Sequence, residues 1–213
     1  MKIEEELINL IERYPSLDSC KKEILLAYEI LLNALKGNKT IFVAGNGGSS
    51  ADADHIVGEL VKGFYNAKPL DSNLINKLEN IDKQIGSSIA QRVQKGYKVI
   101  SLTNNSGLLS AFSNDVEDGW IYAYAQEISS LGNEGDVFLG ITTSGNSKNI
   151  ITASVMAKAK NMKVVSLTGQ GGGNIKNYSD VCIAVKENVT HKVQELHLPI
   201  YHFLCLMLHN ELD

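Results

Sequence analysis

Two side chains that can act together on a metal ion or a proton stand four residues apart in the first half of the chain. His55 and Glu59 fall within residues 51–64, whose pattern predicts a helix, so they share one helical face. A histidine and a carboxylate so placed can hold one metal ion or exchange protons with a substrate. Surface His–Glu pairs at this spacing are common, so the pair alone leaves a purely structural role open.

A second group of polar side chains lies in a predicted helix over residues 193–212. Gln194 and His202 are two turns apart on this helix, about 12 Å along its axis. Long side chains that lean toward each other can meet at one ion, although the spacing does not require it. His197 and His209 share the helix and are interpreted as packing or surface histidines, because nothing local selects them.

A glycine-rich turn follows the first predicted strand and opens directly into a helix. In the run Gly45-Asn46-Gly47-Gly48-Ser49-Ser50, glycines let an anion approach the backbone, and the first helical amides point at it. The run differs from a dinucleotide-binding fingerprint, because Ser50 stands where the third glycine would be. No acidic residue follows the second strand in the run 103–105 to bind a ribose hydroxyl. We therefore expect no nicotinamide cofactor, which leaves phosphate binding or plain turn chemistry.

A hydroxyl-rich loop follows the third predicted strand and also leads into a helix. Its sequence is Thr142-Thr143-Ser144-Gly145-Asn146-Ser147, in which four hydroxyl side chains surround one glycine. Such a loop suits a phosphate monoester without a lysine or a metal. Ordinary helix capping needs only one hydroxyl. Two such loops at the strand ends of one sheet favour phosphate binding over turn chemistry.

Five short, β-branched apolar runs recur along the chain, most of them separated by helical patterns. This alternation is typical of an α/β protein whose parallel sheet is covered by helices on both faces. In such sheets the ligand lies beyond the carboxyl ends of the strands, where both loops fall. The predicted strands are residues 40–44, 98–102, 136–141, 163–167 and 181–185.

Two further segments are separated from this pattern by their composition. Residues 1–37 read as helical, with a break at Pro15 and a stop near Gly37, and serve as a packing or subunit-contact element. Residues 65–97 are polar with helical pieces, and are interpreted as a lid, an interface element or a surface excursion.

The composition excludes several classes of protein. The net charge of −4 and the absence of a basic stripe argue against nucleic-acid binding. The three cysteines are sparse and odd in number, which indicates reduced thiols rather than a disulfide framework. The acidic, amphipathic start is unlike a secretion signal, and no run is long enough to span a membrane. We therefore expect a cytoplasmic chain with no membrane and no nucleic-acid partner.

The two loops resemble the signature loops of SIS (sugar isomerase) domains, and in particular those of phosphoheptose isomerases. The runs GNGGSSADADH and ITTSGNSKN carry the likeness, which covers most of the chain from about residue 38 onward. It implies a single SIS domain over residues 1–213, with 1–37 as an N-terminal helical segment and 65–97 as an insertion between the first and second strands. The implied fold is a five-stranded parallel sheet flanked by helices, a flavodoxin-like three-layer sandwich. The implied assembly is a homotetramer with active sites between subunits.

The resemblance also implies an activity, a metal and a set of site residues. In these isomerases the residues matching His55, Glu59, Gln194 and His202 bind zinc, and those matching Glu59 and His202 transfer protons. The expected reaction converts sedoheptulose 7-phosphate to a D-glycero-heptose 7-phosphate through an enediol, with Glu59 as base, ligand or both. Hydroxyls matching Ser49, Thr142, Ser144 and Ser147 bind the phosphate. The full set expected to contact substrate is Asn46, Gly47, Ser49, Asn105, Thr142, Ser144, Ser147 and Gln194.

The alternative is a non-catalytic phosphosugar-binding or scaffold protein, similar to replication-initiator-associating proteins. Those share the fold and the loops but lack the full catalytic set, which is present here. Three departures from the isomerase pattern affect substrate recognition. Asn105 stands where the family often has Asp, Gly63 stands where it usually has Arg, and residues 65–97 are longer than usual.

Overall fold

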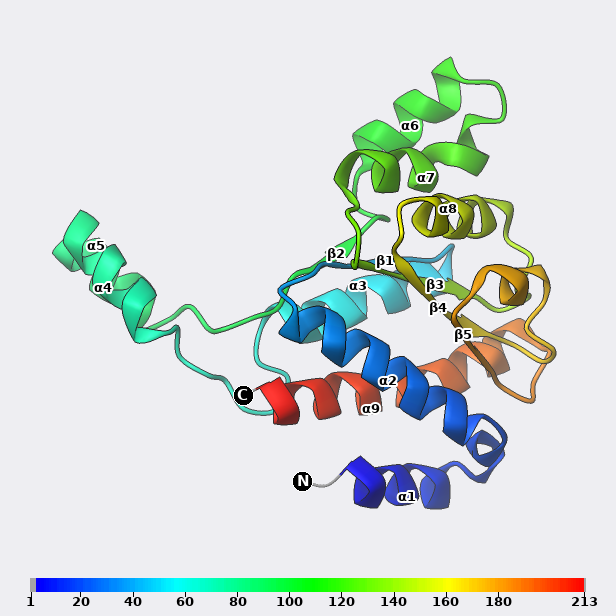
Figure 1. Cartoon of the computed structure of the whole chain (residues 1–213), viewed down its shortest axis with the longest axis horizontal. Coiled ribbons are helices and arrows are strands. Elements are labelled where there is room, and N and C mark those ends of the chain that lie inside the picture. The colour runs from blue at the N-terminus through cyan, green and yellow to red at the C-terminus, as the bar shows by residue number, and fades with distance from the viewer. Residues whose placement is uncertain (1–2, 213) are drawn as a thin grey trace.

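Residues 3–212 are described by a computed structural model, in which five parallel strands form one sheet with helices on both faces (Figure 1). The strand order is β2-β1-β3-β4-β5, so the direction of winding reverses between β1 and β3. This confirms the predicted flavodoxin-like three-layer sandwich. Residues 1, 2 and 213 of the predicted domain lie outside the described residues. The strands are β1 (Ile41–Ala44), β2 (Val99–Ser101), β3 (Val137–Thr142), β4 (Lys163–Thr168) and β5 (Val181–Ala184).

The central strands are buried on both faces, as their apolar runs predict. Every residue of β1 and β3 is buried. Because successive side chains point to opposite faces, Val43 and Leu139 enter one core cluster while Phe42 and Phe138 enter the other. The sheet therefore separates two apolar cores, each of which needs its own layer of helices.

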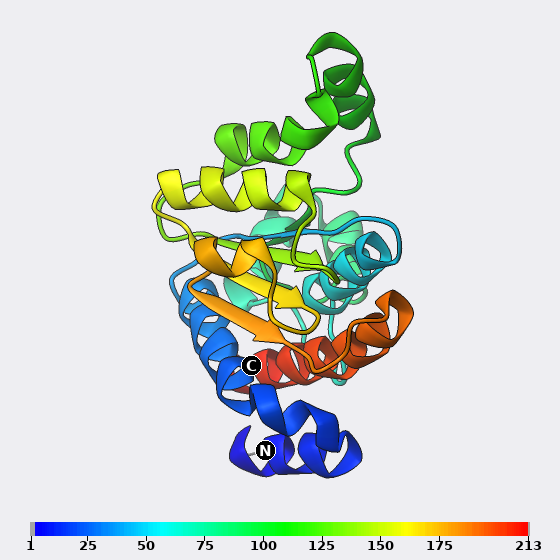
Figure 2. The same ribbon diagram turned by 90° about the vertical axis from the view of Figure 1, so that its right-hand side faces the viewer.

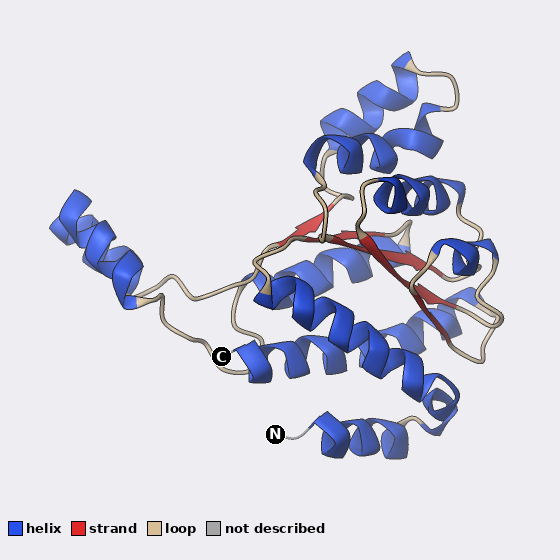
Figure 3. Ribbon diagram, viewed as in Figure 1, coloured by secondary structure: helices blue, strands red, loops and turns tan. Residues whose placement is uncertain are grey.

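Different sets of helices cover the two faces of the sheet (Figures 2 and 3). One face of the sheet carries the core shared by α2, α3 and α9, and α1 packs outside α9. The other face carries α7 and α8, with α6 packed on α7. Between residues 3 and 212 no helix is both long and apolar enough to cross a membrane. The bounds are α1 (Ile3–Arg13), α2 (Lys21–Lys36), α3 (Gly48–Val61), α6 (Ser106–Asp115), α7 (Gly119–Leu131), α8 (Lys148–Ala159) and α9 (Thr190–Leu212).

The N-terminal segment follows the predicted pattern within the described residues. Pro15 ends α1 and begins the 3-10 helix η1 (Pro15–Cys20), because proline suits the first position of a helix but not its interior. Gly37 closes α2. A second 3-10 helix, η2 (Asn174–Tyr178), precedes β5, and Pro199 lies inside α9.

Residues 65–97 form an arm that stretches away from the sheet and its helices (Figure 1). The arm contains α4 (Ser72–Ile81) and α5 (Lys83–Ala90), which are capped by Asp71 and Asp82. Pro69 and Gln94 pair in an antiparallel bridge at its base. The segment that leaves the body after α3 and the segment that returns to it before β2 therefore lie side by side at the base of the arm.

Candidate active site

The two predicted loops meet at the point where the strand order reverses. β1 leads into α3 on one face of the sheet and β3 leads into α8 on the other. Sheets of this topology bind their ligands between two such loops, and we refer to this position as the crevice. The side-chain amides of Asn46 and Asn149 exchange two hydrogen bonds of 2.9 and 2.8 Å between the first loop and α8. Asn149 was not predicted as a site residue, although it lies in the motif ITTSGNSKN.

The first loop is shaped by close backbone packing. A Cβ at Gly45 would lie 2.2 Å from the carbonyl oxygen of Ser49, so only glycine fits there. Gly47 adopts a φ of 55° and leaves the N-terminus of α3 without a side-chain cap. Ser49 is buried beside the first turn. Uncapped amides at a helix N-terminus are suited to an anion.

The second loop gathers its hydroxyls at the N-terminus of α8. Thr142 Oγ1 and Ser147 Oγ are 2.8 Å apart, and Ser144 Oγ accepts a hydrogen bond of 3.1 Å from the amide of Asn146. Gly145 has a φ of 67° and packs against the backbone of Gly172. Ser147 precedes α8 without capping it. The structure therefore brings together two of the four hydroxyls of the second loop, those of Thr142 and Ser147, while the hydroxyl of Ser144 bonds to the backbone of the loop itself.

Asn105 lies apart from these hydrogen-bonded groups, in the loop after β2. Its Oδ1 accepts a hydrogen bond of 3.2 Å from the amide of Leu108 and so caps α6. Its Nδ2 donates to Glu127 Oε1 at 3.5 Å. Burial raises the pKa of Glu127 above the usual value. The described contacts of Asn105 are therefore with α6 and α7, and its role in substrate binding stays a prediction.

Three of the four predicted metal ligands converge between α3 and α9. His55 Nε2 lies 3.1 Å from Glu59 Oε1 and 3.4 Å from His202 Nε2. The rings of His55 and His202 stand edge to face, with centroids 5.0 Å apart, and Phe64 tilts onto His202. Burial, and then the neighbouring His55, lower the pKa of His202, while Glu59 opposes the shift. We refer to His55, Glu59 and His202 as the His–Glu–His cluster.

A tyrosine that sequence reasoning did not select fixes the orientation of His55. The hydroxyl of Tyr201 donates to Asp52 Oδ1 at 3.2 Å and lies 3.1 Å from His55 Nδ1. Burial and the neighbouring Asp52 raise the pKa of Tyr201, so its hydroxyl keeps its proton. Because the hydroxyl of Tyr201 uses its proton in the hydrogen bond to Asp52, its oxygen accepts a hydrogen bond from Nδ1–H of His55.

This chain of hydrogen bonds limits what can lie between His55 and Glu59. A neutral His55 protonated on Nδ1 presents the lone pair of Nε2 to Glu59 Oε1, which is also an acceptor. Two acceptors 3.1 Å apart repel each other unless a proton or a cation lies between them. Asp52 lies near the start of α3, within the motif GNGGSSADADH. It caps nothing here and partners Tyr201.

The remaining polar residues of α9 have other partners. Gln194 lies over the first loop, where a Cβ on Gly48 would be 2.4 Å from its Nε2. His197 is buried with Nε2 3.2 Å from the carbonyl oxygen of Thr168, and His209 Nε2 lies 2.9 Å from the carbonyl oxygen of Glu59. Both histidines are therefore packing residues, as predicted. No described contact joins Gln194 to the cluster.

The donor types of the cluster fit zinc, but the described residues are not arranged as a formed metal site. Among residues 3–212 no group of three His, Cys, Asp or Glu side chains has the geometry to hold an ion. Imidazole nitrogen and carboxylate oxygen are nonetheless ligands that zinc prefers. The observation that suits a cation is the distance of 3.1 Å between His55 Nε2 and Glu59 Oε1, together with the hydroxyl of Tyr201 at Nδ1.

Fold and site together define the class of protein, which is a doubly wound α/β protein with a glycine-rich loop and a hydroxyl-rich loop at the switch point and the His–Glu–His cluster on α3 and α9. SIS-domain family models match residues 6–115 and 108–207. A phosphoheptose isomerase of Leptospira biflexa is 36% identical over 196 residues, 92% of this chain and 87% of the relative. Phosphoheptose isomerase 2 of Campylobacter jejuni is 35% identical over 209 residues, covering 98% and 84% of the two chains.

Solved structures of the same kind superpose on the whole fold. The phosphoheptose isomerase of Neisseria gonorrhoeae matches with a TM-score of 0.72 at 27% identity, over 97% of this chain and 98% of that one. The enzyme of Francisella tularensis matches with a TM-score of 0.73 at 26% identity, over 97% and 94% of the two chains. The chain belongs to the phosphoheptose isomerase family of SIS-domain proteins.

Proposed function

We propose that this chain is a sugar-phosphate isomerase that interconverts sedoheptulose 7-phosphate and a D-glycero-heptose 7-phosphate. The observation that carries the proposal is that one helix, α3, begins in the anion crevice and bears His55 and Glu59 further along. His55 lies seven residues after Gly48, about 10 Å along the axis. This is on the order of the length of an open-chain seven-carbon sugar phosphate, so phosphate and carbonyl reach their partners together.

The crevice binds the phosphate in this proposal. The N-termini of α3 and α8 supply backbone amides, and Ser49, Thr142, Ser144 and Ser147 supply hydroxyls. Asn46 and Gly47 shape the first loop, and the Asn46–Asn149 amide pair fixes its distance from α8. Asn105 and Gln194 complete the proposed substrate set.

The cluster performs the proton transfers. The carboxylate of Glu59 removes the proton from the carbon beside the carbonyl and returns it to the neighbouring carbon, passing through an enediol. The lowered pKa of His202 keeps its imidazole neutral near neutral pH, so that it can move a proton between the two substrate oxygens. Tyr201 and Asp52 hold the ring of His55 and direct its Nε2 toward the reacting groups.

Zinc is the proposed metal, held by His55, Glu59 and His202, with Gln194 as the fourth ligand. When bound, the ion supplies a Lewis acid that polarises the substrate carbonyl. The support is the donor set and the orientation of His55 Nε2. Metal content measured by mass spectrometry on wild type and His55→Ala tests this without an activity assay.

The assembly and the location are proposed from the family resemblance. We propose a homotetramer, with a sugar phosphate as the small-molecule partner and no nucleic acid. We also propose a cytoplasmic location, which is supported by the unpaired thiols of Cys20, Cys182 and Cys205.

The deciding experiment is an isomerisation assay with sedoheptulose 7-phosphate, with and without added zinc. Glu59→Gln should lower kcat by about 10²- to 10⁴-fold, because it removes the base while conserving size. Glu29→Gln, an exposed carboxylate on α2, is the matched control and should behave as wild type. Binding of the sugar phosphate without turnover by zinc-loaded wild type would favour the non-catalytic alternative. If the protein turned over a different sugar phosphate and not sedoheptulose 7-phosphate, that other compound would become the proposed substrate.

A further inference from the structure

The carboxyl group of Glu127 on α7 is buried with few hydrogen-bond partners. The residue is 6% exposed, and its Oε2 has no hydrogen-bond partner among the described residues. Its Oε1 accepts one long hydrogen bond of 3.5 Å, from Asn105 Nδ2. Burying a carboxyl group with so few donors lowers the stability of a protein. A group of this kind therefore calls for an explanation other than stability.

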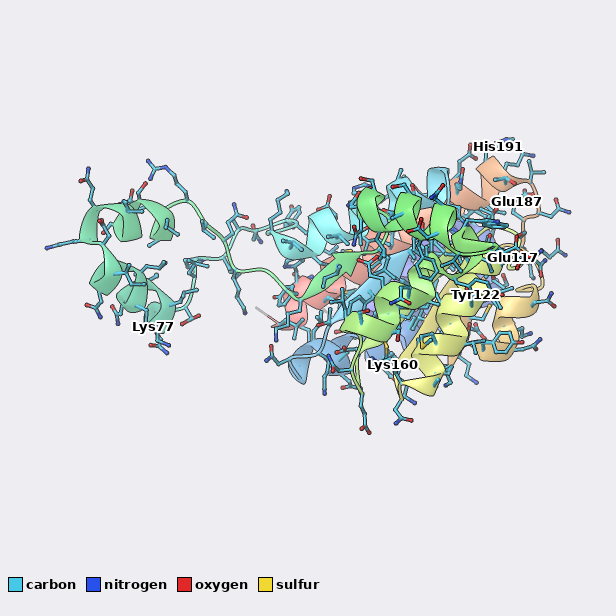
Figure 4. The ribbon with its side chains drawn as sticks, turned by 90° about the horizontal axis from the view of Figure 1, so that it is seen from above. Lys77, Glu117, Tyr122, Lys160, Glu187 and His191 are labelled. Atoms are coloured by element: carbon cyan, nitrogen blue, oxygen red, sulfur yellow. The ribbon has the colours of Figure 1, made fainter. Side chains whose placement is uncertain are left out.

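α7 turns Glu127 toward the loops that follow β1 and β2. Tyr122 is exposed on the outer side of the helix, where Figure 4 labels it, whereas Tyr124 and Glu127 are buried about one turn apart. The hydroxyl of Tyr124 donates a hydrogen bond of 3.0 Å to the carbonyl oxygen of Gly45 in the first loop. Because β1 and β2 are neighbouring parallel strands, their loops lie at the same edge of the sheet. α7 therefore contacts one loop through Tyr124 and the other through Glu127.

The loop after β2 is also fixed to α3, on its other side. Asp54 Oδ1 accepts hydrogen bonds of 2.6, 2.8 and 2.9 Å from Ser101 Oγ, Thr103 Oγ1 and Asn104 Nδ2. These contacts hold the backbone that leads to Asn105. The direction of the Asn105 side chain is then set by its own hydrogen bonds.

The side-chain amide of Asn105 presents a donor to a ligand. Its Oδ1 accepts a hydrogen bond from the backbone N–H of Leu108, and this partner can only donate, so the oxygen end of the amide is fixed at α6. Of the two N–H groups on Nδ2, one is directed at Glu127. Because Asn105 is exposed, the other N–H is accessible.

We propose that Glu127 is a positioning residue for substrate recognition, which directs one N–H of Asn105 toward an oxygen atom of the sugar. The inference rests on the proposed function, in which Asn105 contacts the sugar phosphate. In this arrangement the phosphate lies at the first two loops, while the loop after β2 offers a neutral donor to a hydroxyl or carbonyl oxygen. The unpaired, buried carboxyl group of Glu127 is then retained for recognition at the expense of stability.

The variants Glu127→Met and Glu127→Gln test this role in the Glu59→Gln background, by isothermal titration calorimetry. Glu127→Met removes Oε1 and should weaken binding of sedoheptulose 7-phosphate about 10-fold, because the amide of Asn105 loses its orientation. Glu127→Gln keeps an oxygen that accepts the hydrogen bond, so it should restore the affinity of the parent. Inorganic phosphate should bind all three proteins equally. Gln126→Met, at the exposed neighbouring position on α7, is the matched control.

Thermal unfolding separates a positioning role from support of the fold. Glu127→Met should unfold at the same temperature as its parent or at a higher one, because it replaces a buried carboxyl group that has an unpaired oxygen. A lower melting temperature together with weaker binding of inorganic phosphate would show that Glu127 only supports the fold. Unchanged affinity of Glu127→Met for the sugar phosphate would also overturn the proposal.

A measurement without ligand keeps this inference distinct from the proposed function. In ¹H–¹⁵N spectra, the side-chain amide signals of Asn105 should move in Glu127→Met toward the positions of freely exposed asparagines. Signals of Asn105 that do not respond to Glu127→Met would contradict the positioning role. If they respond, but the parent protein binds inorganic phosphate and no sedoheptulose 7-phosphate, the result supports the orientation of Asn105 by Glu127 and counts against the proposed substrate.

Discussion

At the scale of single residues, the cluster owes its orientation to side chains that are not themselves predicted ligands. The resemblance to the isomerases identified His55, Glu59 and His202 in the sequence, because their types and spacing alone left a structural role open. Tyr201 stands in an apolar run next to His202 and reads there as a core tyrosine. Its contact with Asp52 and His55 depends on how α3 and α9 pack, which sequence spacing does not specify.

Removing the hydroxyl of Tyr201 tests its positioning role. Tyr201→Phe should weaken zinc binding by about 10- to 100-fold, because hydrogen-bond partners behind a ligand contribute this much to affinity. The measurements are competition with a chelating dye and the ring ¹⁵N shifts of His55, which report its tautomer without metal. Tyr28→Phe on α2 is the control. Equal zinc affinity and an unchanged tautomer would contradict the role assigned to Tyr201.

His197 should make the stability of the protein depend on pH. Burial lowers its pKa from 6.5 to about 4, while Thr168 opposes the shift. As the pH falls from about 6.5 toward 4, the unfolded chain binds the proton first, so stability drops over this window. The full shift corresponds to about 3 kcal/mol.

Urea unfolding at pH 7 and pH 4.5 measures this effect. His197→Gln keeps an N–H donor for the carbonyl of Thr168 but cannot titrate, so it should lose less stability than wild type between the two pH values. An equal loss in both proteins would assign the pH dependence to other groups.

At the scale of elements, the strands could be predicted closely and the arm could not. Short β-branched runs between helical patterns have few other interpretations, and each observed strand falls within a residue or two of its predicted bounds. Residues 65–97 allowed three interpretations because their helices are amphipathic without a core to face. The amide pair between the first loop and α8 could also not be predicted, because its partners are 103 residues apart in the sequence.

That amide pair should couple the loop after β1 energetically to the loop after β3. Asn46→Ala and Asn149→Ala each leave the other amide without its partner, so the double variant should cost less than the sum of the two. We expect a coupling of about 1–2 kcal/mol from two hydrogen bonds of a side-chain pair. Denaturant unfolding of the four proteins measures it. Asn9→Ala on α1 combined with Asn46→Ala should be additive, and additivity in the test pair as well would show that the loops are independent.

At the scale of the whole molecule, ligand binding should stabilise the fold, because the crevice draws on both faces of the sheet. Sedoheptulose 7-phosphate at 100 times its Kd should add about 2.7 kcal/mol, which raises Tm by roughly 5–10 °C for a chain of this size. Glu59→Gln is the protein to use, since it should bind the ligand while turning it over far more slowly than wild type.

Differential scanning calorimetry with and without ligand gives the shift. Ser144→Ala/Ser147→Ala in the same background should lose most of it, because both hydroxyls belong to the second loop. If the ligand raised the Tm of this variant as much as that of Glu59→Gln, the second loop would not be part of the phosphate site.

The packing of α9 against α1 and α2 also has a consequence for how the protein is made. The apolar faces of α1 and α2 belong to the same core as α9, which follows every strand of the sheet in the chain. During synthesis these first helices emerge with nothing to cover them, and non-local contacts of this kind form late. A growing chain therefore presents an aggregation-prone surface to chaperones until α9 arrives, and α9 is also the helix that brings His202. Burial of the N-terminal helices and completion of the His–Glu–His cluster thus become one folding event.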